Sequence, residues 1–161
     1  MSTIRQATAA DQNNIWDIIH QVISSSKYYA FSPDTSKNEM LSYWCAPDKR
    51  AYVALLDGRV AGTFILKDNQ PGLGNHIANA SYMTLPELSG RGIGTLMAKY
   101  SFEEAKKLGY RAMQFNMVVK SNNTAIQLWL KLGFAIIGEI PDAFRHPERG
   151  FINAYIMYKK L

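Results

Sequence analysis

The sequence Ser89-Gly90-Arg91-Gly92-Ile93-Gly94 separates an apolar segment, residues 77–85, from an amphipathic segment that ends near Gly109. Residues 77–85 predict a buried strand that Pro86 stops, and the segment after the glycines has helical spacing of its apolar side chains. The first N–H groups of a helix lack partners within it, so a glycine-rich turn from strand to helix predicts an anion site. Alternatively, the glycines serve only a loop that requires positive φ.

The segments before this turn predict short strands and helices. Residues 3–8 predict a strand, residues 11–24 a helix, and residues 36–45 a second helix with a capping box formed by Ser36 and Glu39. Asp57-Gly58 lies between two apolar runs, and this dipeptide predicts a β-hairpin because its turn requires positive φ.

The order of the predicted elements favours an α/β fold. Beyond Gly109 they are a strand at 112–119, a helix from Asn122 to about residue 132, and strands at 134–138 and 153–158. The β-α-β unit around Gly92 predicts a parallel strand pair, and the hairpins predict antiparallel neighbours. We therefore expect one domain, residues 1–161, with a mixed, mostly antiparallel seven-stranded sheet and helices on both faces.

The composition excludes several classes of protein. Of the 161 residues, 47% are hydrophobic and 19% are charged, as in an ordinary globular domain, and the single Cys45 rules out an internal disulfide or a multi-cysteine zinc site. The net charge of +5 is spread along the chain, and a small phosphorylated ligand or a solvated surface explains it as well as nucleic acid does. No basic helix or stacking aromatic pattern supports a nucleic-acid function. No signal peptide or membrane span is indicated, so we expect a cytoplasmic protein without a metal.

Two common phosphate-binding motifs do not fit the glycine turn. A P-loop requires Gly-Lys-Ser/Thr at the helix start, but Gly94 is followed directly by Thr95. A Rossmann G-x-G-x-x-G motif would need glycine at the position of Thr95 or Met97. Neither motif therefore identifies the anion.

The remaining pattern resembles the GNAT (GCN5-related N-acetyltransferase) superfamily. Its Q/R-x-x-G-x-G/A signature corresponds to residues 89–94, with Ser89 at the first position. Its N-x-x-A-x-x-L-Y-x-x-x-G-F motif corresponds to residues 122–134, with Trp129 in place of Tyr. The resemblance covers nearly the whole chain. It implies an N-acetyltransferase that binds acetyl-CoA between two parallel strands that splay apart, residues 77–85 and 112–119.

The resemblance also implies which residues contact the cofactor. Main-chain groups near the end of the first splayed strand would bind pantetheine, the glycine turn would bind pyrophosphate, and the next helix would flank the arm. The expected contacts are Met83, Thr84, Leu85, Ser89, Gly90, Arg91, Gly92, Ile93, Gly94, Thr95, Asn122, Ala125 and Trp129. Asn122 is equally suited to be a plain helix N-cap, and it can serve both purposes.

The acceptor is less closely defined. Residues 140–147 and 150–155 resemble a GNAT subgroup that includes fungal azetidine-carboxylate acetyltransferases, which implies a small amino or imino acid as substrate. Acetylation of protein or peptide amines, and a non-catalytic acyl-CoA sensor module, remain alternatives. Many GNAT proteins are dimers, so the resemblance leaves a homodimer open.

The acid and base of the reaction are not identified. Trp129 stands where many family members use a Tyr acid, and an indole N–H does not release its proton at useful pH. We therefore expect Trp129 to pack on the cofactor arm or in the core. A thiolate with an ordinary pKa of about 8.5 leaves without much help. Candidate bases are His20, His76 and His146, although each is more often a surface or hydrogen-bonded histidine. Glu87 is expected to be exposed, and water is the remaining base.

Two asparagines interrupt the apolar strands on either side of the expected cofactor. Asn79 and Asn116 are unusual there because asparagine is depleted in strands, and a buried amide needs partners. We expect the pair to bind a substrate carboxylate or amide; hydrogen bonding within the protein is the alternative. Tyr28, Tyr29 and Phe31 are expected to line the substrate pocket or to pack in the core.

Overall fold

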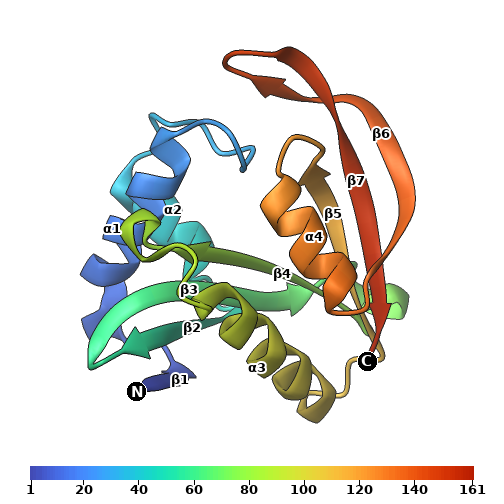
Figure 1. Ribbon diagram of the computed structural model, residues 1–161. Helices are drawn as coiled ribbons and strands as arrows, with labels where there is room; N and C mark the ends of the chain where they lie inside the picture. The colour runs from blue at the N-terminus through green and yellow to red at the C-terminus, as the bar shows by residue number, and fades with distance from the viewer.

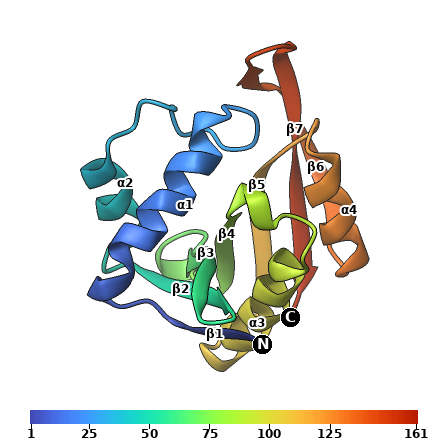
Figure 2. The same cartoon turned by 60° about the vertical axis from the view of Figure 1, so that its left-hand side comes forward.

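The computed structural model describes residues 1–161 and places helices on both faces of one seven-stranded sheet (Figures 1 and 2). The strands are β1 (Ser2–Gln6), β2 (Lys49–Leu56), β3 (Arg59–Asp68), β4 (Ile77–Thr84), β5 (Ala112–Val119), β6 (Ala135–His146) and β7 (Gly150–Lys160). The helices are α1 (Gln12–Ser24), α2 (Lys37–Trp44), α3 (Ile93–Lys107) and α4 (Asn123–Lys131). No helix is both long enough and apolar enough to cross a membrane.

The sheet is mixed, as the sequence predicts. Its strand order is β1-β2-β3-β4-β5-β7-β6, and every neighbouring pair is antiparallel except β4 and β5. The parallel pair is joined by α3, which is the predicted β-α-β unit. β4 and β5 share only two register pairs, and Figure 1 shows them separating toward the end of β4 that leads into the glycine turn.

The core consists of two apolar layers, one on each face of the sheet. α1 and α2 cover one layer, in which Ile15, Ile19 and Trp44 are fully buried against β3 and β4. α3 and α4 cover the other layer, where Phe64 and Met97 are fully buried. The residue alternation in each strand sends successive side chains to opposite layers, so both faces of β3 and β4 are covered.

Turn and cap signals in the sequence are confirmed by the backbone. Asp57 and Gly58 have φ of 50° and 82° in the β2–β3 hairpin, and Gly109 has φ of 89° just after α3. Ser36 and Glu39 form the predicted reciprocal capping box at the start of α2. Each of these features depends on residues within one turn of chain, which explains why the sequence reveals them.

The last two strands are longer than the predicted ranges, 134–138 and 153–158. β6 runs past the predicted end at residue 138 and through Pro141. The pairing of β6 with β7 shifts register between Ile140 and Phe144, so Pro141 lies in an irregularity of an edge strand, where its missing N–H does not interrupt a central ladder. The first strand is also shorter than predicted and ends at Gln6.

Asp11, at the start of α1, is buried and forms an ion pair with Arg5 that the sequence does not reveal. The Arg5 guanidinium donates to both carboxylate oxygens at 2.7 and 2.9 Å, and the main-chain N–H of Thr8 donates a third hydrogen bond. These bonds, chiefly those from Arg5, lower the pKa of Asp11 to about 2 against the opposing effect of burial. A depressed folded-state pKa stabilises the fold above the unfolded pKa and loses that effect as the pH falls toward the folded value.

We expect Asp11→Asn to reduce the free energy of unfolding at pH 7 by about 1–2 kcal/mol, because Arg5 is half exposed and the ion pair is partly screened. The difference between the variant and the native protein should shrink as the pH falls from about 4 to about 2. Urea unfolding at a series of pH values measures it. Asp34→Asn, at an exposed carboxylate without an ion pair, is the control; an equal pH dependence in both variants would contradict the assignment.

Candidate active site

The gap between β4 and β5 begins just after their last register pair, Ala78 with Met113. At the next residue the side-chain amide of Asn79 donates to the main-chain oxygen of Gln114, 2.9 Å away. A side chain therefore links the two strands at the point where main-chain pairing stops. Beyond it, the inner edges of both strands have no partner strand.

The main-chain groups at the end of β4 point in alternating directions. The N–H of Leu85 donates to the oxygen of Ala61 on the β3 side, at 2.9 Å. Because successive residues of a strand point to opposite edges, Met83 also faces β3, whereas Thr84 faces the gap. The side chains of Met83 and Leu85 are buried under α1. Of these three predicted cofactor contacts, only Thr84 presents its main chain to the gap.

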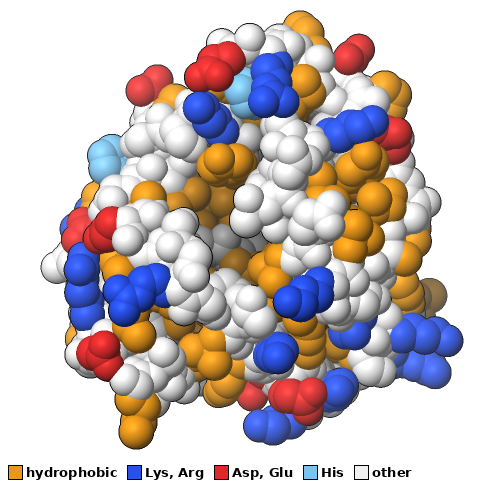
Figure 3. All heavy atoms as spheres, viewed as in Figure 1, with side chains coloured by type: hydrophobic (Ala, Val, Ile, Leu, Met, Phe, Trp, Pro, Cys, Tyr) orange, Lys and Arg blue, Asp and Glu red, His pale blue; other side chains and the backbone are white.

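A cleft of about 620 Å³ occupies the gap and continues beneath the loop between α1 and α2. Figure 3 shows it as a hollow with apolar side chains on its walls. All five residues predicted to bind substrate line it: Tyr28, Tyr29, Phe31, Asn79 and Asn116. Six of the predicted cofactor contacts line it as well: Thr84, Ser89, Gly94, Asn122, Ala125 and Trp129.

The glycine turn stands at the open end of this cleft. Gly90 and Gly92 both have φ of 79°, and a Cβ at either position would meet no atom within 4 Å. The backbone conformation, and not a lack of space, therefore requires glycine there. The side chain of Ile93 is buried in the core, while Arg91 and Thr95 lie on the turn and the first helical turn outside the cleft lining.

A row of unpaired N–H donors follows from this conformation. Within the protein, the main-chain N–H groups of Gly90, Gly92, Ile93, Gly94 and Thr95 donate to no acceptor. They cluster at the N-terminus of α3, where the helix dipole adds partial positive charge. Such a group of donors is suited to a phosphate or pyrophosphate anion.

Aromatic side chains form the α4 wall of the cleft. Trp129 is 8% exposed and packs against Tyr82, Phe115 and Phe134, with ring centres 5.1, 4.6 and 5.6 Å away. Its indole N–H makes no hydrogen bond within the protein. Asn122 caps α4, since its side-chain oxygen accepts from the N–H of Ala125 at 3.3 Å. The N-cap interpretation of Asn122 is confirmed, and its predicted cofactor contact stays a prediction.

Tyr82 is a cleft residue that the sequence does not single out, because an aromatic residue in a strand is ordinarily a core residue. The hydroxyl of Tyr29 donates a hydrogen bond to the main-chain oxygen of Tyr82. This bond connects the α1–α2 loop to β4. The hydroxyl of Tyr82 itself is hydrogen-bonded to Ser101, 2.6 Å away. Burial raises the pKa of both tyrosines, so both hydroxyls stay protonated at neutral pH.

The two asparagines are close to the gap, but their amide nitrogens already have protein acceptors. Asn116 donates to the side-chain oxygen of Asn69 at 2.8 Å and accepts from the side chain of Gln114 at 3.0 Å. Asn79 donates to the main chain of Gln114, whereas its own side-chain oxygen accepts no hydrogen bond from the protein. The alternative of hydrogen bonding within the protein is therefore observed, and binding of substrate by the pair stays a prediction.

None of the candidate bases lies in the cleft. His20 is exposed on α1, His76 lines a separate pocket at the start of β4, and His146 is buried in the β6–β7 hairpin, where its Nδ1 accepts from the N–H of Glu148. Glu87 is half exposed and forms an ion pair with Arg59.

The cleft has only one charged side chain, Lys67 at the end of β3. In the sequence this lysine follows an apolar run, where it has the appearance of an ordinary solvated strand end. Its position beside the gap depends on the pairing of β3 with β4. The cleft can therefore bind, orient and desolvate a ligand, and Lys67 gives it a positive charge.

Comparison with known proteins identifies similar chains and folds. The sequence pattern of the "Acetyltransferase (GNAT) family" matches residues 16–134. N-acetyltransferase aca1 of Schizosaccharomyces pombe is 35% identical over 96 residues, which are 59% of this chain and 46% of that protein, so the match spans less than half of the relative. A GCN5-related N-acetyltransferase from Kribbella flavida has a TM-score of 0.94 at 35% identity, over 99% of this chain and 98% of that one. A phosphinothricin acetyltransferase from Sinorhizobium meliloti, solved in complex with AcCoA, shares the fold with a TM-score of 0.86 at 24% identity, over 99% and 88%.

Proposed function

The chain belongs to the acetyltransferase (GNAT) family, and we propose that it transfers the acetyl group of acetyl-CoA to the amine of a small amino or imino acid. The observation that carries this proposal is the group of unpaired N–H donors of Gly90 and of residues 92–95 at the mouth of the gap between β4 and β5. It matches the charge of a pyrophosphate, and the gap beside it offers unpaired strand edges to an extended ligand.

The residues at the gap suit acetyl-CoA. The N–H groups of the glycine turn would bind the pyrophosphate, the main chain of Thr84 would pair with the pantetheine arm, and Trp129 with Ala125 would flank it. When bound, acetyl-CoA supplies a thioester carbonyl that accepts the amine. The S. meliloti enzyme, which has the same fold, was solved with AcCoA, and this supports the assignment.

The size of the cleft favours a small acceptor over a protein. Its volume of about 620 Å³ would hold the end of the pantetheine arm together with the acceptor, which leaves room for a small molecule. The α1–α2 loop also approaches the β6–β7 hairpin, since Lys27 and Glu148 form an ion pair at 3.3 Å. A peptide acceptor would have to pass between these two segments.

The proton of the amine would leave to water. The cleft lining contains no carboxylate and no histidine, and burial keeps the Tyr29 and Tyr82 hydroxyls protonated. The protein would contribute by orienting the free amine and by excluding water, which are large contributions to the rate of a bimolecular reaction.

The direct test combines calorimetric titration with acetyl-CoA and a thiol-release assay over amino acids, polyamines, aminoglycosides and peptides. We expect acetyl-CoA to bind and thiol release to be fastest with one of the amino or imino acids. Binding without release from any amine would instead identify an acyl-CoA sensor. Release with peptides alone would identify a peptide acetyltransferase.

The pH dependence of the reaction follows from the absence of a titrating base in the cleft lining. We expect log kcat/KM to rise with unit slope until the amine of the substrate is deprotonated, without an enzyme pKa between about 5 and 8. His20→Gln and His76→Gln should each change kcat/KM by less than about 2-fold. An inflection between these pH values that disappears in either variant would identify that histidine as the base.

A further inference from the structure

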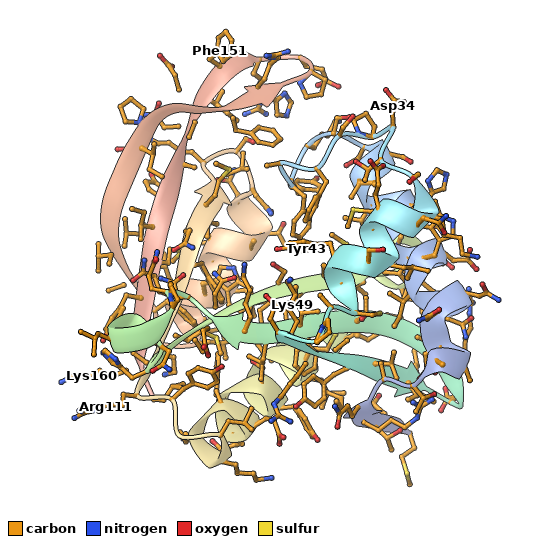
Figure 4. All side chains as sticks on the ribbon, turned by 180° about the vertical axis from the view of Figure 1, so that it is seen from behind. Asp34, Tyr43, Lys49, Arg111, Phe151 and Lys160 are labelled. Atoms are coloured by element: carbon orange, nitrogen blue, oxygen red, sulfur yellow. The ribbon has the colours of Figure 1, made fainter.

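Lys67 is a half-buried lysine in the cleft, and no carboxylate is in contact with its ammonium group. It forms no salt bridge, whereas its cross-strand neighbour Lys49 pairs with Asp48 at 3.0 Å. Both lysines flank the ring of Tyr43, with the Nζ of Lys67 5.8 Å and that of Lys49 4.3 Å from the ring centre. Figure 4 shows Tyr43 and Lys49 close together beside α2. Only one of the two lysines therefore has a carboxylate in contact; Asp48 attracts Lys67 from a longer distance.

The register of the sheet places Lys67 beside the gap. It is directly opposite Asn79, and Ile65 is opposite Ser81. Residues that face each other across an antiparallel pair project to the same face, so these side chains share the face that α1 and α2 cover. Ile65 packs in the core beneath α1, and the face becomes polar at Lys67 and Asn79, where the cleft lies.

The neighbouring polar groups are acceptors and complement this cation. The side-chain oxygen of Asn79 accepts no hydrogen bond from the protein, and the hydroxyl of Ser81 makes none. An α-amino acid carries its ammonium and its carboxylate on the same carbon atom. With the carboxylate at Lys67, the amine two bonds from the carboxyl carbon would face the acceptors on β4, the strand that borders the gap.

We propose that Lys67 binds the carboxylate of the acceptor and restricts the enzyme to amines that carry an adjacent anionic group. The assignment rests on the proposed acetyl transfer and adds the residue that would recognise the carboxylate of the acceptor. In this arrangement Lys67 is a specificity residue, and the amide nitrogens of Asn79 and Asn116 hold the β-strands and the β3–β4 loop instead of the carboxylate.

The test compares an amino acid with its carboxamide, which keeps the amine and loses the negative charge. Proline with prolinamide and alanine with alaninamide are the first pairs. Because a charge-assisted hydrogen bond is lost, Lys67→Met should lower kcat/KM for the acid by roughly 10- to 100-fold and for the amide by less than about 3-fold. Lys67→Arg should retain most of the activity with the acid. Calorimetry of the acid against the protein saturated with CoA should show the same loss of affinity in Lys67→Met.

Lys160→Met is the matched control, since it removes the same charge from an exposed lysine that points outward at the far end of β7 (Figure 4). Equal losses for acid and amide in Lys67→Met would overturn the assignment, as would a native enzyme that prefers the amide. If no amine is acetylated although acetyl-CoA binds, the proposed function fails. The calorimetric comparison then still decides on Lys67, and equal affinity of the native protein and Lys67→Met for the amino acid overturns its role.

Discussion

Gly92→Asp is expected to weaken acetyl-CoA binding by about 100-fold or more, because it places a carboxylate among the donors that would hold the pyrophosphate. At an effective dielectric constant of about 20, two unit charges about 4 Å apart repel by about 4 kcal/mol. The backbone of Gly92 is in the left-handed region with φ of 79°, and a side chain there would point into open space. Calorimetric titration with acetyl-CoA measures the effect.

Gly92→Asn is the matched control for this variant. Asn and Asp have the same shape and both tolerate a left-handed backbone better than other residues do, so the two variants differ mainly in charge. We expect Gly92→Asn to weaken binding by less than about 10-fold. Both variants should melt within a few degrees of each other. Equal affinity of the two variants for acetyl-CoA would show that the anion is bound elsewhere.

Trp129→Ala is expected to reduce the free energy of unfolding by about 3 kcal/mol, at the lower end for a large-to-small aromatic change because one side of the ring faces the cleft. The indole packs against Tyr82, Phe115 and Phe134, and its removal would leave a cavity next to β5. For a domain of this size, the melting temperature should fall by roughly 6–12 °C. Differential scanning calorimetry and urea unfolding measure the two quantities.

Trp129→Phe separates packing from the indole N–H. It keeps most of the aromatic contact and removes the donor, so we expect a smaller loss of stability, below about 1.5 kcal/mol, and a kcat within about 3-fold of the native value. A large fall in kcat without a loss of stability would mean that the N–H acts in the reaction. A negligible loss of stability in Trp129→Ala would mean that Trp129 contributes little to the core.

The fold class and most element boundaries can be predicted from the sequence because their signals are local. Asp57-Gly58 requires positive φ, Ser36 and Glu39 cap each other three residues apart, and the glycine turn starts a helix. Each preference acts within one turn of chain, where the sequence alone specifies the neighbours. The parallel pair of β4 and β5 follows from the β-α-β connection in the same way.

The limits of β6 and β7 could not be predicted, because they depend on the position of a strand in the sheet. Pro141 is a break in a central strand but is tolerated at a bulge of the edge strand β6. The ion pair of Arg5 with Asp11 could not be predicted either, because its strength depends on how deeply the surrounding elements bury the carboxylate.

Some features of the site can likewise be predicted from the sequence, and others depend on the tertiary structure. The sequence by itself determined the mixed α/β fold and the glycine turn at the start of α3, and it pointed to Asn79, Asn116 and some of the aromatic residues that line the cleft. Only the tertiary structure decided which of these groups remain free to bind a ligand. Tyr29 donates to the main chain of Tyr82, and Asn79 donates to that of Gln114, across segments far apart in the chain. Lys67 lies in the cleft lining without a salt bridge, because the pairing of β3 with β4 places it there. Backbone preferences act within a few residues, whereas hydrogen-bond partners and uncompensated charges are settled only when distant strands and loops pack together.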